Sequence, residues 1–94
     1  MFRHVVSFKL KEDKKQMMGE AKKRLEALIE IPEVKNFEVG VDEFASGRSF
    51  DFVIIVDFAN LDDYKIYDNH ELHGPVRDFI HEIVCDAVAV DYSI

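Results

Sequence analysis

Hydrophobic and polar residues alternate along the first segment of the chain, from Phe2 to Leu10. A period of two residues is typical of a strand with one buried face. Residues 35–43 alternate in the same way, whereas the centres of 50–58 and 87–93 are apolar on both faces. The pattern therefore predicts four strands.

Residues between these strands follow a helical period. Asp13 and Gln16 form a capping-box pattern, which predicts a helix from there to about Ile29, before Pro32. Residues 61–68 predict a short helix, and Pro75 suits the first position of another. The predicted core faces are Met18, Ala21, Leu25, Leu28 and Ile29 in the first helix, and Val76, Phe79, Ile80, Ile83 and Val84 in the last, which leaves Arg77, Asp78, His81 and Glu82 in water.

The predicted order is β-α-β-β-α-β in one domain over residues 1–94. This is an α+β, ferredoxin-like pattern: a four-stranded antiparallel sheet with its helices on one face. Val53, Ile55 and one set of the Ala/Val pairs near the C-terminus then lie on the other face. Because an exposed apolar sheet face is an association surface, we expect a homodimer whose two sheets close a barrel.

Composition narrows the possible functions. A formal net charge of -7 argues against a nucleic-acid partner, which requires a basic face. No apolar stretch reaches membrane-spanning length, and the N-terminus does not resemble a signal peptide. A single cysteine, Cys85, excludes an intrachain disulfide. We therefore expect a soluble cytoplasmic protein with no membrane partner.

The candidate chemistry lies in YDNHELHGP, residues 67–75. Tyr67 ends the short helix, and we place His73 just ahead of the next, where the helix dipole disfavours a charged ring. His4 and Asp91 point toward the helices from their strands, and Asp91 is expected to orient His73. Such a set can move protons near neutral pH. Alternatively, these histidines cap backbone groups or complete the core. HELH is not the HExxH zinc motif.

Five segments, in order, resemble the stress-responsive dimeric A/B barrel (Dabb) family over essentially the whole chain. They are HVVSFKLK, IPEVKNFEVGVD, RSFDFVIIVDFANLDDY, the YxxHxxH run at 67–73, and VAVDYSI. The resemblance implies a ferredoxin-like fold that dimerises into an α/β barrel. Most of the family has no assigned activity, and its name implies a stress response.

The resemblance also implies site residues. In a plant polyketide cyclase of this family, a tyrosine and a histidine of the YxxHPxH run catalyse aldol closure without a cofactor. These correspond to Tyr67 and His73, with His4 and Asp91 beside them. Here Glu71 replaces the proline, and Phe52 stands where the cyclase has a further histidine. Some plant members hold magnesium through backbone carbonyls, which would be those of Leu28, Ile31 and Val34.

Three functional hypotheses follow. The first is a pocket for a small carbonyl compound, lined by Val6, Phe8, Phe52, Ile54 and Phe79. The second is a non-enzymatic stress-protection or interaction dimer. The third is a cyclase- or lyase-type enzyme without a cofactor, in which His73 is the base, Asp91 its orienting partner, and Tyr67 the donor to an enolate oxygen.

Overall fold

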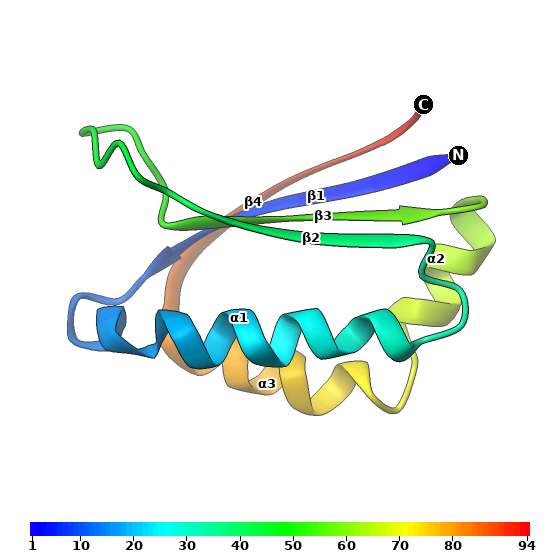
Figure 1. The fold of residues 1–94 in the computed structure, drawn as a ribbon, viewed down its shortest axis with the longest axis horizontal. Coiled ribbons are helices and arrows are strands. Elements are labelled where there is room, and N and C mark those ends of the chain that lie inside the picture. Colours follow the sequence, from blue (N-terminus) through cyan, green and yellow to red (C-terminus); the bar gives the residue numbers. More distant parts are fainter.

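Four strands form one antiparallel sheet in the order β2-β3-β1-β4, and the helices cover one of its faces (Figure 1). The computed structural model describes residues 1–94. In chain order the elements are β1 Phe2–Leu10, the 3-10 helix η1 Glu12–Met17, α1 Met18–Glu26, the 3-10 helix η2 Ala27–Glu30, β2 Asn36–Val41, β3 Phe52–Phe58, α2 Leu61–Asp68, α3 His73–Ile83 and β4 Val84–Ser93. The predicted ferredoxin-like order is confirmed.

The core lies between the sheet and the helices. Val6 pairs with Ile54, and Phe8 with Phe52, so the alternating apolar residues of β1 and β3 meet on one face. Ala21 and Leu25 of α1 and Leu28 of η2 cover this face. Ile80 and Ile83 cover it from α3, and all five side chains are buried. The apolar face predicted for the first helix is correct except at Ile29, whose exposed fraction is 47%.

Two predicted helix starts are wrong. The first helix along the chain, η1, has Lys11 as its N-cap, and the Asp13 side chain caps no backbone group. Instead, the Gln16 amide donates to the Asp13 carbonyl at 3.0 Å. The helix α3 begins at His73, so Pro75 is its third residue. A proline fits there because the first N–H groups of a helix have no intrahelical partner.

The opposite face of the sheet has no helix over it. Val53 and Ile55 are half-buried there, and Val88, Val90 and Tyr92 of β4 are exposed, with Val90 at 66%. The same face also carries an ion pair, in which Arg3 Nε lies 2.7 Å from Asp57 Oδ1. The loop between β2 and β3 rises on this side, away from α1 and α3 (Figure 1). The predicted apolar, uncovered face is therefore present.

No helix has both the length and the hydropathy that crossing a bilayer requires.

Candidate functional site

A cavity of about 220 Å³ lies between the sheet and the helices. Its apolar lining comes from Val6, Phe8, Leu25, Ile54, Val76 and Ile80, and its polar lining from His4, Tyr64, Tyr67, Asp68, His73, Arg77 and His81. All four side chains predicted to carry chemistry are therefore at or beside this cavity, because Asp91 contacts His4. An apolar hollow with a few convergent polar groups is the usual form of a small-molecule site.

Aromatic rings form a continuous row along the polar end of the cavity. The ring centroids of His4 and Tyr64 are 4.7 Å apart, those of Tyr64 and Tyr67 are 6.1 Å apart, and those of Tyr67 and His73 are 4.6 Å apart. The row joins β1 to α2 and α3. Packing of this kind holds Tyr67 and His73 in a fixed relation.

His73 is held through its Nδ1 atom. This atom lies 3.0 Å from the Asp68 carbonyl oxygen and 2.9 Å from Arg77 Nη2. Because a guanidinium only donates and a carbonyl only accepts, the neutral ring can use Nδ1 for one of these contacts. If Nδ1–H donates to Asp68, then Nε2 keeps a lone pair that can take a proton. If Nδ1 accepts from Arg77, then Nε2 carries hydrogen and only donates.

The surroundings of His73 favour the neutral ring. Burial lowers the pKa of His73 below its ordinary value, and the Arg77 charge lowers it further, although the hydrogen bond to the Asp68 carbonyl acts in the opposite direction. A neutral ring was predicted from the helix dipole. The structure places His73 within the first turn of α3 and makes burial the leading cause.

Tyr67 is 1% exposed, yet its hydroxyl has no hydrogen-bond partner in the chain. Since no sealed side-chain oxygen or nitrogen lacks a partner, this hydroxyl must face the open part of the cavity. Burial raises the pKa of Tyr67 well above its ordinary value, so the phenol stays protonated at neutral pH. Tyr67 can therefore donate a hydrogen bond to a bound molecule.

Asp91 was predicted to orient His73, but it does not contact that ring. It lies directly across from His4 in the β1–β4 register, and its Oδ1 is hydrogen-bonded to His4 Nδ1. Directly opposed residues on one sheet face are the pairs that can touch, whereas His73 lies on a helix. The carboxylate therefore fixes the orientation of His4, and the backbone of Asp68 takes that role for His73.

A sequence model of the stress-responsive A/B barrel domain matches residues 2–94. The chain belongs to the Dabb family. No curated protein matches it.

Solved structures extend the comparison. A dimeric protein of unknown function and ferredoxin-like fold from Bacteroides fragilis is 30% identical, with a TM-score of 0.88, and the match covers 99% of this chain and 95% of that one. A dimeric ferredoxin-like protein of unknown function from Thermobifida fusca is 25% identical, with a TM-score of 0.89 and coverages of 99% and 90%. A Dabb family protein from Mesorhizobium loti is 29% identical, with a TM-score of 0.75 and coverages of 99% and 95%.

Two residues predicted to line the pocket of this Dabb domain do not line the cavity. Phe52 is the first residue of β3, two positions before the cavity-lining Ile54. Its ring stacks on Phe8, with ring centroids 4.8 Å apart. Phe79 packs under Arg24 of α1, at 4.1 Å from the guanidinium carbon to the ring centroid. It lies about 100° around α3 from Ile80, which does face the cavity. Val6, Phe8 and Ile54 line the cavity, as predicted.

Tyr64, Asp68, Arg77 and His81 also line the cavity of the Dabb domain, although the sequence did not single them out for it. Arg77 and His81 were expected to lie in water; His81 is exposed and the Arg77 side chain is 41% exposed, but both also border the cavity. They follow His73 at four-residue steps, so the three side chains share one stripe of α3. That spacing was a signal in the sequence. His70, in contrast, is a turn residue, whose Nδ1 accepts a hydrogen bond from the Leu72 N–H at 3.1 Å.

Of the predicted magnesium ligands, Leu28 lies in η2, and Ile31 and Val34 lie in the turn between η2 and β2. The Leu28 carbonyl accepts a hydrogen bond from Ile31 N–H at 3.1 Å, and the Ile31 carbonyl accepts one from Val34 N–H at 3.0 Å. Each oxygen keeps a second lone pair, but three neutral carbonyls supply none of the negative charge that magnesium sites usually contain. Magnesium binding there stays a prediction. The chain has no cluster of three or more His, Cys, Asp or Glu side chains suited to a metal ion.

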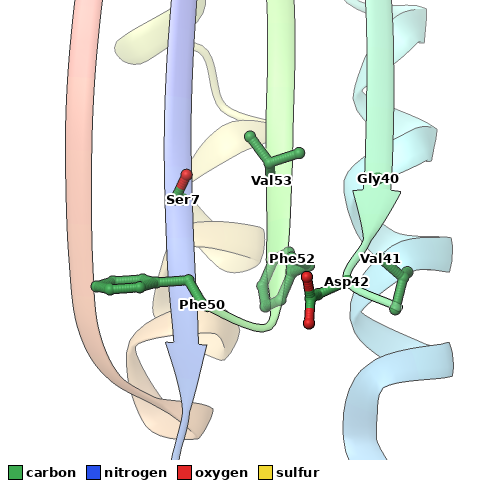
Figure 2. Close-up of a pocket in the computed structure, with 7 residues that line it drawn as sticks. All are labelled: Ser7, Gly40, Val41, Asp42, Phe50, Phe52 and Val53. Atoms are coloured by element: carbon green, nitrogen blue, oxygen red, sulfur yellow. The ribbon is translucent and has the colours of Figure 1, made fainter. Parts of the chain in front are cut away.

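A second hollow, of about 300 Å³, lies at the foot of the β2–β3 loop (Figure 2). Ser7 and Val53 line it from the uncovered sheet face, and Phe50 extends across β1 beside them. Asp42 is its one ionisable side chain, and that carboxylate accepts a hydrogen bond from the Ala45 N–H. No acid–base pair lies there, so the candidate chemistry belongs to the cavity under the helices.

Proposed function

We propose that this Dabb protein is a homodimer that binds a small carbonyl compound in the cavity between its sheet and helices. The observation that carries the proposal is that His73 and Tyr67 reach the same cavity with complementary free groups. His73 has one ring nitrogen without a protein partner, and Tyr67 has an unpaired hydroxyl. A carbonyl oxygen needs a donor such as this phenol in an otherwise apolar space.

The same arrangement supports proton transfer next to a carbonyl. With Nδ1–H donating to Asp68, His73 Nε2 would remove a proton from the carbon beside the carbonyl. Tyr67 would donate to the oxygen as negative charge develops on it. His4, oriented by Asp91, offers a second imidazole across the row of rings. The reaction class would be a polyketide-cyclase-like aldol closure or a related lyase step without a cofactor.

Dimerisation is supported by the sheet face that no helix covers. Val88, Val90 and Tyr92 expose apolar surface there, and the relatives from Bacteroides fragilis and Thermobifida fusca are dimeric. A second copy placed on this face would remove that surface from water. The helix-side cavity lies on the other face, so each protomer would keep its own cavity. A cytoplasmic location and a role in the stress response remain part of the proposal.

One observation favours the non-enzymatic alternative. Both His73 and Arg77 reach the carbonyl of Asp68, the last residue of α2. Basic groups at the end of a helix satisfy carbonyls that have no intrahelical partner. These contacts would stabilise the fold without any ligand.

A thermal-shift screen of carbonyl metabolites separates the two functions. It uses wild type, His73→Ala, Tyr67→Phe and the control His70→Ala, in which a turn histidine outside the cavity is removed. We expect at least one compound to stabilise wild type and His70→Ala. Loss of the Tyr67 hydroxyl alone should weaken that binding by about tenfold or more. If no compound stabilises wild type, or if Tyr67→Phe and His73→Ala bind as wild type does, the proposed carbonyl site is wrong.

A further inference from the structure

Arg77 is the only lysine or arginine that lines the helix-side cavity. It projects from α3, one turn beyond His73. The protein as a whole carries a formal charge of -7. A permanent positive charge at its only acid–base cavity is therefore not expected from the overall composition. An arginine in such a place is suited to bind a planar anionic group.

The guanidinium of Arg77 is only partly used by the chain. Its Nη2 lies 2.5 Å from the Asp68 carbonyl oxygen and 2.9 Å from His73 Nδ1. Its Nε–H and both Nη1–H groups have no acceptor within the protein. Capping α2 therefore explains one nitrogen of the fork and leaves donors that a bound molecule can use.

The carboxylates near the cavity do not occupy these donors. Asp68 Oδ1 forms a partly exposed ion pair with Arg77 Nη2 at 3.6 Å, which is too long for a hydrogen bond and leaves Nε and Nη1 free. Asp91 is engaged by His4. Of the other ionisable groups that line the cavity, His73 contacts only Nη2, and His4, Tyr64, Tyr67 and His81 make no hydrogen bond to Arg77. An acceptor for the free N–H groups of Arg77 must therefore come from water or from a ligand.

From this arrangement we infer that the ligand is a keto acid whose carboxylate binds Arg77 while its carbonyl reaches Tyr67 and His73. The inference rests on the proposed function and makes Arg77 the residue that determines specificity. Residues four apart on a helix have Cβ atoms about 5–6 Å apart, so the two ligand groups would be separated by a few carbons. Beta- and gamma-keto acids have that spacing, and the apolar lining would hold the remainder of the molecule.

The test compares benzoylpropionic acid, its methyl ester and butyrophenone, which share an aryl ketone body. Calorimetry on wild type should show the acid binding about tenfold or more tighter than the ester or the ketone. Arg77→Met should remove that difference, and Arg77→Lys should keep part of it because the charge remains. Arg48→Met, on the exposed β2–β3 loop, is the matched control and should behave as wild type.

The results of this calorimetry distinguish the keto-acid inference from the proposed carbonyl pocket. If ester and ketone bind wild type as tightly as the acid, the keto-acid inference is wrong and the carbonyl pocket stands. If none of the compounds binds wild type, both claims fail for this ligand class. If Arg77 only caps α2, Arg77→Met will lower the melting temperature but leave the ratio of acid to ester affinity unchanged. The ratio in wild type and in Arg77→Lys is decisive even if Arg77→Met does not fold.

Discussion

Replacing Phe52 with alanine tests which way β3 faces. Phe52 is 2% exposed, and its ring stacks on Phe8 at 4.8 Å. Removing a buried aromatic side chain forfeits about 2–3 kcal/mol of transfer free energy and about 1 kcal/mol of ring packing. An unfilled cavity adds to this, so we expect the free energy of unfolding to fall by about 3–5 kcal/mol. That is a large share of the stability of a domain of this size.

The assay is urea denaturation at one protein concentration, since the stability of a dimer depends on concentration. Phe44→Ala is the matched control, because Phe44 is 85% exposed on the β2–β3 loop. Phe52→Leu, which keeps most of the apolar volume, provides a milder variant if Phe52→Ala does not fold. A near-neutral result for Phe52→Ala would mean that β3 presents Phe52 and Ile54 to the uncovered face. Both the cavity and the dimer surface would then be misplaced.

Two further predictions concern the uncovered face and His73. Val90→Lys should convert the dimer to monomer in sedimentation velocity, because burying an unpaired ammonium in an apolar interface costs several kcal/mol. The control Ile66→Lys, at an exposed site on α2, should leave the dimer intact. If wild type is itself monomeric, the dimer prediction is wrong. In an NMR titration, the His73 pKa should lie below about 6.5 and rise in Arg77→Met. Since the unfolded chain then binds the proton more readily, the contribution of His73 to stability is present above about pH 6.5 and is lost as the pH falls; a pKa above 6.5 would contradict the buried, neutral ring.

Local pattern was enough to predict much of the fold. The bounds of β1 and α2 agree with the prediction, because alternation over Phe2–Leu10 is a local signal, and the structure shows that Asn60 caps α2 by accepting a hydrogen bond from the Asp63 N–H. The apolar residues on both faces of β3 are a local signal that predicted the apolar, uncovered sheet face. The start of α3 was predicted less well, since several positions in a first turn tolerate proline and local pattern does not choose between them.

The sequence by itself determined the strand and helix order, the two faces of the sheet, and a tyrosine and histidines near one turn. Only the tertiary structure decided how those side chains pair. Asp91 contacts His4 because strand register sets them opposite each other, and no local pattern specifies register between strands so far apart in the chain. Arg77 and His81 face the cavity because α3 is rotated so that Val76 and Ile80 meet the sheet. That rotation results from packing of the whole apolar face of α3 against the core. Core packing, rather than the motif at residues 67–75, therefore determined which polar side chains line the cavity.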